Sequence, residues 1–257
     1  MELAERTART AGRILLDGLD QVRVDVRTKS SATDMVSEMD RAAEVAIEEL
    51  LLGARPDDGM LGEEGTDRAG TSGVRWIVDP LDGTTNYLYG LPGFAVSIAA
   101  EVDGEVRAGV VYDVVRDELF AATKGGGATR DGRPIRCSDA ADLPTALLAT
   151  GFAYDSERRR AQAEVVVQVI PRVRDIRRFG AAAVDLCTVA CGRLDGYWER
   201  GLAPWDLAAG ALIASEAGAV VTDFDGGPPA RGAVVAAAPG IAAPLRALLL
   251  AAGAPDA

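Results

Sequence analysis

The order of the predicted helices and strands constrains this 257-residue chain most strongly, because that order changes partway along the sequence. Two helices come first, and strand-like runs joined by tight turns follow them. From about residue 155 helices and strands alternate. Runs joined by hairpin turns are typical of an antiparallel sheet, whereas alternation is typical of a parallel or mixed sheet covered by helices. The sequence therefore predicts an α/β (α+β) chain with one sheet of each kind.

Apolar spacing and turn residues predict the individual elements. Gly18 is expected to end a first helix over 2–17, and Ser37 to cap a second helix over 38–52. The first half is predicted to contain strands at 74–79, 94–102, 106–115 and 118–122. The second half is predicted to contain helices at 155–169, 181–191, 205–217 and 241–252, and strands at 174–179, 194–199, 219–224 and 232–238. A boundary near 140–144 divides the chain into 1–141 and 142–257.

The chain contains no histidine, which excludes every mechanism that needs an imidazole. A Ser-His-Asp triad, a Cys-His pair and His-ligated zinc are all ruled out. Catalysis must then use carboxylates, hydroxyls, backbone dipoles, arginines, the two lysines or a bound metal. The net charge of −12 also disfavours direct binding of nucleic acid, since such binding needs clustered Lys and Arg.

Cysteine usage and the apolar segments indicate a cytoplasmic protein without a membrane segment. Cys137, Cys187 and Cys191 form no C-x-x-C pair, which is the pattern of a reducing compartment. The N-terminus lacks the apolar segment of a signal peptide. The longest uncharged stretch, 83–100, contains glycines and a proline, so we do not expect it to span a membrane as a helix.

Acidic residues are densest at 57–82, and one of them, Asp79, ends an apolar strand. A carboxylate at the inner end of a buried strand must be paired, protonated or bound to a metal. The only basic residues in this stretch are Arg68 and Arg75, which are too few to pair its acids. Asp79 is therefore the first candidate for a metal ligand.

The segment Asp-Pro-Leu-Asp-Gly-Thr-Thr-Asn, which begins at Asp79, combines the features of a metal site and a phosphate site. If the proline turns the chain, Asp79 and Asp82 can share a hard cation, and the Leu81 carbonyl can point at the same ion. Gly83 allows a close approach of the backbone. Thr84 can begin a short helix whose free N–H groups face an anion. The segment therefore predicts metal-assisted phosphoryl chemistry.

A rival interpretation is an aspartyl-phosphate phosphatase of the haloacid dehalogenase type, whose motif is Asp-x-Asp-Gly-Thr. The spacing here is Asp-x-x-Asp-Gly-Thr. In a strand, residues i and i+2 share a face, whereas residues i and i+3 do not. The extra residue therefore favours two metal ligands around a turn over a nucleophile with its acid.

Several motifs, in order and over nearly the whole chain, resemble those of the inositol monophosphatase family of Mg²⁺-dependent, Li⁺-sensitive phosphatases. The strongest is the run 76–86, with Leu81 where isoleucine is commoner. The others are Gly62-Glu63-Glu64, Trp205-Asp206-Leu207-Ala208-Ala209-Gly210, Lys29-Ser30-Ser31 with Asp34 and Asp40, and the stretch 174–197, which is similar to the bacterial inositol-1-monophosphatase branch. The resemblance implies a layered sandwich, with most metal ligands in 1–141 and Asp206 and the substrate-ring contacts in 142–257. It also implies a homodimer.

The same resemblance implies roles for particular residues. Two or three Mg²⁺ ions are expected, held by Glu63, Asp79, the Leu81 carbonyl, Asp82 and Asp206. The catalytic residues are expected to be Asp40 and Thr84, which position and deprotonate the attacking water, together with Glu63. Substrate contacts are expected from Asp82, Gly83, Thr84, Gly180, Ala181, Ala182, Glu199 and Asp206.

The residues alone leave plainer interpretations of three of these acids open. Asp40 can be an acid of a first helical turn, and Asp206 can be a helix N-cap. Glu199 can form a salt bridge to Arg193 or Arg200.

The function implied is Mg²⁺-dependent hydrolysis of a sugar-alcohol phosphate monoester, with myo-inositol 1-phosphate as the first choice. The family alternatives are histidinol phosphate, fructose 1,6-bisphosphate and 3′-phosphoadenosine phosphate. Thr85 stands where lysine is expected in the histidinol-phosphate branch, and no basic, aromatic segment suited to a nucleotide is apparent. An alternative from another class is a regulatory protein that binds RNA polymerase, although the intact acidic set argues for retained catalysis.

Overall fold

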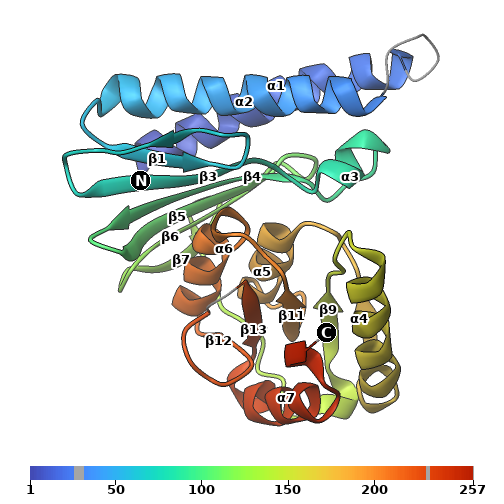
Figure 1. The fold of residues 1–257 in the computed structure, drawn as a ribbon. Coiled ribbons are helices and arrows are strands. Elements are labelled where there is room, and N and C mark those ends of the chain that lie inside the picture. Colours follow the sequence, from blue (N-terminus) through green and yellow to red (C-terminus); the bar gives the residue numbers. More distant parts are fainter. Residues whose placement is uncertain (26–31, 230–231, 257) are drawn as a thin grey trace.

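The computed structural model describes residues 1–25, 32–229 and 232–256, which form two sheets separated by helices (Figure 1). The first sheet has eight strands in the order β2-β1-β3-β4-β5-β6-β7-β8. They are β1 (Gly59–Gly62), β2 (Asp67–Arg68), β3 (Val74–Asp82), β4 (Ala95–Val102), β5 (Glu105–Asp113), β6 (Glu118–Thr123), β7 (Gly127–Arg130) and β8 (Arg133–Pro134). β1 and β3 run parallel, and the other neighbours run antiparallel. The prediction of a mostly antiparallel first sheet is confirmed.

The second sheet has five strands in the order β10-β9-β11-β13-β12. They are β9 (Leu147–Thr150), β10 (Asp175–Arg177), β11 (Gly196–Arg200), β12 (Val220–Thr222) and β13 (Ala233–Ala237). β9 runs parallel to both of its neighbours, and β13 runs antiparallel to both of its own. This sheet is mixed, as predicted.

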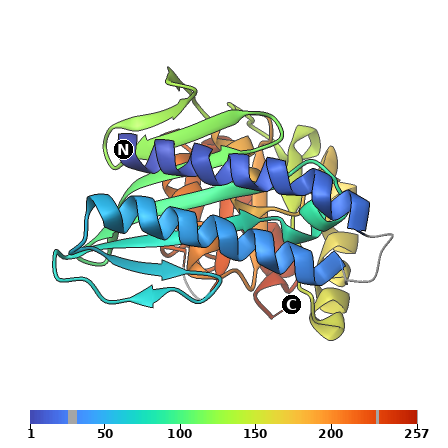
Figure 2. The ribbon, with the colours of Figure 1, turned by 90° about the horizontal axis from the view of Figure 1, so that it is seen from above.

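Helices complete a layered sandwich. α1 (Glu2–Asp25) and α2 (Ala32–Ala54) lie side by side over one face of the first sheet (Figure 2). α5 (Ala182–Ala190) and α6 (Pro204–Glu216) lie between the two sheets, and α4 (Ser156–Val169) and α7 (Pro239–Ala251) cover the far side of the second (Figure 1). The short elements are α3 (Thr84–Leu88), η1 (Leu143–Thr145), η2 (Ile170–Arg172) and η3 (Ala254–Asp256). The predicted fold class is confirmed, whereas the division at 141/142 stays a prediction.

Both N-terminal helices are longer than the sequence predicted. α1 continues through Gly18, and this glycine serves close packing instead of ending the helix. A Cβ at Gly18 would lie 2.8 Å from the Tyr87 hydroxyl oxygen and 2.3 Å from Met39 Sδ. α2 begins at Ala32, so Ser37 lies inside the helix and not at its cap. Both predictions were wrong, and for Gly18 the reason is that tertiary packing outweighs the local preference of a single residue.

Five strands were not predicted from the sequence, namely β1, β2, β7, β8 and β9. β1 and β2 lie between α2 and β3, in a segment for which the sequence predicted neither a helix nor a strand. β9 lies between β10 and β11, yet it is only four residues long and carries three apolar residues in a row. A short strand inside a sheet that is covered on both faces does not show the alternation by which half-buried strands are recognised.

α6 lies close to the first sheet and to α5 because glycines stand at both contacts. A Cβ on Gly109 of β5 would lie 2.9 Å from the Cα of Ala209. A Cβ on Gly210 would lie 2.9 Å from Cδ1 of Leu186, which belongs to α5. These two glycines therefore set the depth of α6, which carries Asp206 in its first turn.

We expect Gly109→Ala to destabilise the protein by about 1–3 kcal/mol, because the new methyl group meets main-chain atoms of α6. For a chain of this size, that corresponds to a melting temperature lower by roughly 2–12 °C. The control is Gly53→Ala in α2, where a Cβ would meet no atom within 4 Å and the melting temperature should hold or rise. Calorimetry that finds equal melting temperatures for the two variants would contradict this account of the α6 contact.

Candidate active site

β3 brings two carboxylates together through an irregularity in its pairing with β4. The strand was predicted to end at Asp79, but it continues to Asp82, and its register with β4 shifts between these two residues. A bulge of this kind re-aims the side chains that follow it. As a result, Asp79 and Asp82 place carboxylate oxygens within 4.8 Å of one another and of an oxygen of Asp206. We call these three acids the carboxylate cluster.

Gly83 turns the chain from β3 into α3. Its φ angle of 91° lies in the left-handed region that favours glycine, and a Cβ would lie only 2.6 Å from the Gly93 carbonyl oxygen. α3 begins at Thr84, as the sequence predicted. The Thr84 hydroxyl donates a hydrogen bond of 3.1 Å to the Leu81 carbonyl.

Each acid of the carboxylate cluster accepts a hydrogen bond from a backbone N–H. The donors are Leu81 for Asp79 (2.9 Å), Ala183 for Asp82 (2.7 Å) and Ala203 for Asp206 (2.6 Å). These N–H groups belong to β3, to α5 and to the residue before α6. Three parts of the fold thus each hold one carboxylate by one oxygen, and the second oxygen of each can serve a ligand. Asp206 is not the N-cap that the sequence left open, because α6 is capped at Ala203 and Asp206 accepts the Ala203 N–H from the first turn of the helix.

Glu63 adds a fourth carboxylate from the loop after β1. Its N–H donates to the Val78 carbonyl at 3.2 Å, and its side chain lies within hydrogen-bonding reach of Asp79. The next residue, Glu64, donates its N–H to the carboxylate of Glu44 at 2.9 Å. Glu44 belongs to α2 and is buried, so this helix fixes the loop that carries Glu63.

No described Arg or Lys forms an ion pair with these four acids. Burial is the largest cause that raises the pKa of Asp79, Asp82 and Asp206, and the pKa of Asp82 rises to about 8. Neighbouring acids raise the pKa of Asp79 and Asp82 further. Acids that are desolvated together without a counter-charge are unfavourable when ionised. A hard cation would supply that charge, and carboxylate and carbonyl oxygens are the ligands that Mg²⁺ prefers.

The carboxylate cluster faces a cavity of about 340 Å³. The predicted site residues that line the cavity are Glu63, Asp79, Leu81, Asp82, Gly83, Thr84, Gly180, Ala182, Glu199 and Asp206. Residues far apart in the sequence are therefore brought to one place. Ala181 does not line the cavity, because it is buried against Gly83, where a Cβ would lie 3.1 Å from the Cβ of Ala181.

Asp40 also does not line the cavity. It is buried in α2, and its Oδ1 has no hydrogen-bond partner among the described residues. Burial, with smaller effects of Glu64 and Glu63, raises its pKa to about 8. Asp40 therefore lies near the loop that carries Glu63, while no hydrogen bond joins it to Thr84 among the described residues. The predicted motif Lys29-Ser30-Ser31 and the side chain of Asp34 lie outside the described residues.

Glu199 lies near the end of β11 and accepts a hydrogen bond from the Tyr197 hydroxyl. Burial is the main reason that its pKa rises to about 7. The salt bridges considered for it are not formed in the described chain, because Arg193 pairs instead with Glu118 at 2.5 Å and Arg200 makes no ion pair. Glu199 is therefore free to present its carboxylate to the cavity.

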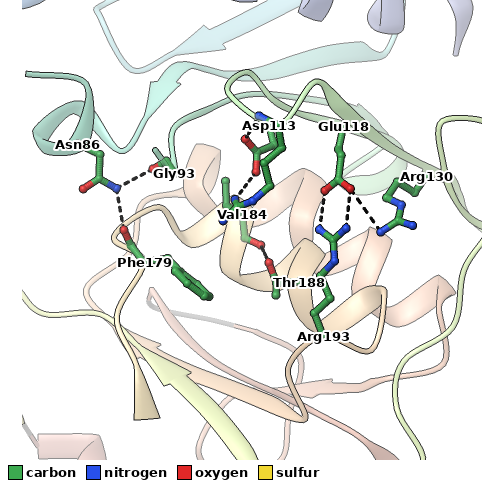
Figure 3. A network of polar contacts seen from close by, with 10 residues as sticks. Asn86, Gly93, Asp113, Glu118, Arg130, Phe179, Val184, Thr188 and Arg193 are labelled. Atoms are coloured by element: carbon green, nitrogen blue, oxygen red, sulfur yellow. Dashed lines mark hydrogen bonds and ion pairs between the residues drawn. The ribbon is translucent and has the colours of Figure 1, made fainter. Parts of the chain in front are cut away.

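Asn86 joins the segment after β3 to the segment before α5 (Figure 3). Its Nδ2 donates to the carbonyl oxygens of Gly93 and Phe179, at 2.7 Å each. Phe179 directly precedes Gly180, which lines the cavity. This bridge therefore positions the part of the cavity wall that contains Gly180. The ion pair between Glu118 and Arg193, in the same view, links the first sheet to the loop after α5.

One wall of the cavity was missed by sequence analysis. It consists of Phe152, Tyr154, Arg158, Arg178 and Arg200. These residues come from three separate segments, so no single stretch of sequence reveals them. The sequence contains no single basic, aromatic segment suited to a nucleotide, but the fold brings aromatic and basic residues of three segments to one cavity wall.

The raised pKa values predict how the stability of the metal-free protein depends on pH. In the folded state Asp82 keeps its proton up to about pH 8, whereas in the unfolded chain it loses the proton near 3.8. Because the folded state binds more protons between these values, its stability should fall as the pH rises through this range. We expect the melting temperature in EDTA to be lower at pH 8 than at pH 6, and excess Mg²⁺ to raise it most at pH 8. A melting temperature in EDTA that rises from pH 6 to pH 8 would contradict this.

Comparisons with known proteins give a consistent picture. The model of the inositol monophosphatase family matches residues 1–252. The inositol-1-monophosphatase of Mycobacterium leprae is 48% identical over 87% of this chain and 81% of its own, and the Nus factor SuhB of Pasteurella multocida is 44% identical over 94% and 92%. The crystal structure of the extragenic suppressor protein SuhB from Bartonella henselae superimposes with a TM-score of 0.88 at 41% identity, covering 97% of this chain and 98% of that one.

Proposed function

Because the chain belongs to the inositol monophosphatase family of phosphatases, we propose that it hydrolyses the phosphate monoester of a sugar alcohol in a Mg²⁺-dependent reaction. We further propose myo-inositol 1-phosphate as the substrate. The observation that carries the proposal is the carboxylate cluster. Two buried acids of β3 and the half-buried Asp206 of α6 converge on one cavity, each oriented by a backbone N–H and none paired with a described cation.

The donor set fits Mg²⁺. It consists of oxygen ligands alone, and no thiol or imidazole of the described residues belongs to it. Glu63, Asp79, Asp82 and Asp206 would hold the metal with the Leu81 carbonyl, and we propose two or three ions. Bound there, Mg²⁺ would stabilise the negative charge of the transferring phosphoryl group and of the leaving oxygen, and would lower the pKa of the attacking water.

The protein's own groups would position the water and the phosphate. The Thr84 hydroxyl lies 3.1 Å from the Leu81 carbonyl oxygen, to which it donates a hydrogen bond. When the hydroxyl turns away from this carbonyl, it can form a hydrogen bond with the attacking water. Glu63, which lines the cavity, is the carboxylate proposed to receive the proton, and Asp40, which does not line the cavity, is proposed to assist it from beside the loop that carries Glu63. The backbone N–H groups of Gly83 and Thr84 would bind the phosphate at the turn that a positive φ makes possible. The reaction needs no covalent intermediate.

The remaining contacts would recognise the polyol. Glu199 can accept hydrogen bonds from two ring hydroxyls, and Asp82 and Asp206 lie beside it on the cavity wall. Gly180 and the neighbouring Ala181 and Ala182 leave room for the ring. Histidinol phosphate, fructose 1,6-bisphosphate and 3′-phosphoadenosine phosphate remain alternative substrates. As a further family property, we propose that Li⁺ inhibits the enzyme.

Removing one charge from the carboxylate cluster should abolish activity without unfolding the protein. We expect Asp82→Asn to lower kcat on myo-inositol 1-phosphate by orders of magnitude, because the amide keeps the shape but binds a hard cation poorly. The control is Asp57→Asn, an exposed acid outside the cavity, which should leave kcat unchanged. Phosphate release with and without Mg²⁺ provides the measurement. Full activity of the wild-type protein in excess EDTA would refute the metal mechanism.

Glu199→Gln should affect the choice of substrate more than the chemistry. Charge-assisted hydrogen bonds contribute about 1.5–3 kcal/mol, so kcat/KM for myo-inositol 1-phosphate should fall roughly ten- to a hundredfold. Glycerol 2-phosphate, which has no ring hydroxyls, should be hydrolysed almost as before. Equal losses on both substrates would instead assign Glu199 to support of the metal site, and no loss on either would remove it from recognition.

A second role is a regulatory one in which the protein binds RNA polymerase. The name Nus factor carried by the Pasteurella multocida relative supports this candidate. The two roles are separable, because Asp82→Asn should keep a surface interaction while it loses hydrolysis. Pull-down of RNA polymerase by the wild type and by this variant tests it, and capture by neither would remove the second role.

We also propose a homodimer and a cytoplasmic location. No helix among the described residues is long and apolar enough to cross a membrane.

A further inference from the structure

Glu199 is held from behind the cavity wall by a neighbour on its own strand. Tyr197 and Glu199 lie two residues apart on β11, so their side chains share one face of the sheet. The Tyr197 hydroxyl donates a hydrogen bond to Oε2 of Glu199. Tyr197 is fully buried, whereas Glu199 lines the cavity. One carboxylate oxygen is therefore engaged inside the protein, which leaves Oε1 for a ligand.

Gly151 lies directly against the same carboxylate. β9 and β11 run parallel with Trp198 beside Thr150, and one step further along this register brings Glu199 beside Gly151, the residue after β9. A Cβ built on Gly151 would overlap Cδ and both carboxylate oxygens of Glu199. The φ angle of Gly151 is not positive, so the backbone conformation does not require a glycine here. The space that the carboxylate occupies is what requires it.

The main chain at Gly151 is fixed more firmly than the Glu199 side chain. β9 is an inner strand, with β10 on one side and β11 on the other. Two residues after Gly151, the N–H of Ala153 donates to Oε1 of the buried Gln162 at 2.7 Å. A carboxylate at the end of a flexible side chain yields more readily than a main chain held in this way. Because Tyr197 closes the side behind it, a Glu199 carboxylate displaced by a side chain at position 151 would move into the cavity.

We propose that Gly151 is a specificity-determining residue, because its lack of a side chain lets the Glu199 carboxylate lie back in the cavity wall and leaves room for a ring-sized polyol. Tyr197 is the positioning residue that holds the carboxylate there. A cavity of about 340 Å³ is at the small end of ligand sites, so a carboxylate pushed into it would take space that the ring needs. The inference rests on the proposed function, since it assumes that Glu199 contacts the polyol.

Gly151→Ala should change the choice of substrate while the metal chemistry continues. We expect kcat/KM for myo-inositol 1-phosphate to fall by about tenfold or more, because the displaced carboxylate loses its hydrogen bonds to the ring, and kcat/KM for glycerol 2-phosphate to fall by about twofold or less. Tyr197→Phe should lower the first value by about threefold or more and spare the second. The control is Gly227→Ala, where a Cβ would lie 3.4 Å from the Asp223 carboxylate, and it should change neither. If neither Gly151→Ala nor Tyr197→Phe alters the choice of substrate, the inference is refuted.

A double-mutant cycle tells positioning of Glu199 from general damage to the fold. Glu199→Ala removes the carboxylate that the new methyl group would displace. Adding Gly151→Ala to this variant should therefore leave kcat/KM for myo-inositol 1-phosphate the same within about twofold. Losses that add up in the double variant, or that extend equally to glycerol 2-phosphate, would make Gly151 a structural residue and overturn its role in specificity.

The crystal structure of the Gly151→Ala variant separates this inference from the proposed function. It should show the Glu199 carboxylate moved into the cavity, with β9 and β11 unmoved. If the wild type hydrolyses no phosphate ester but this displacement is seen, the proposed function fails and the positioning of Glu199 by Gly151 stands. If the wild type hydrolyses myo-inositol 1-phosphate but Glu199 keeps its place in the variant, the positioning is refuted and the proposed function stands.

Discussion

The structure depends on the desolvation of several carboxylates at one point between its two sheets. Asp79, Asp82 and Asp206 repel one another when ionised, and no described cation neutralises them. The fold opposes this repulsion with one backbone N–H for each acid. Such bonds fix the direction of each carboxylate, but they do not supply a full counter-charge. The carboxylate cluster is therefore suited to a bound cation. Without a cation, repulsion between these acids should lower the free energy of unfolding of the protein.

The layers of the sandwich can be understood as supports for these acids. α2 is held over the first sheet and, through Glu44, fixes the loop that carries Glu63. α6 approaches β5 and α5 at glycines, and this depth sets the position of Asp206. Asn86 ties α3 to the segment that carries Gly180 on the cavity wall. The same contacts that bury apolar surface thus also determine the geometry of the site.

The parts of the site that lie close together in sequence were predictable, and the parts assembled by tertiary packing were not. Asp79 and Asp82 could be predicted because a carboxylate after a buried strand needs a partner. Asp206 was identified only through the resemblance to a family, since a single Trp-Asp pair has many explanations. Arg158, Arg178 and Arg200 come from three segments with no shared pattern, so only the fold brings them together. Gly18 was misread as the end of a helix because packing of α1 against Met39 and Tyr87 outweighs the preference of one residue.

The central claim is that the carboxylate cluster forms a metal site, and anomalous scattering from crystals soaked in MnCl₂ tests it most directly, because Mn²⁺ takes the same oxygen ligands as Mg²⁺. The account predicts anomalous peaks within bonding distance of Asp79, Asp82 and Asp206, with the Leu81 carbonyl as a further ligand. Crystals that show Mn²⁺ elsewhere only, with these carboxylates hydrogen-bonded to one another, would contradict it.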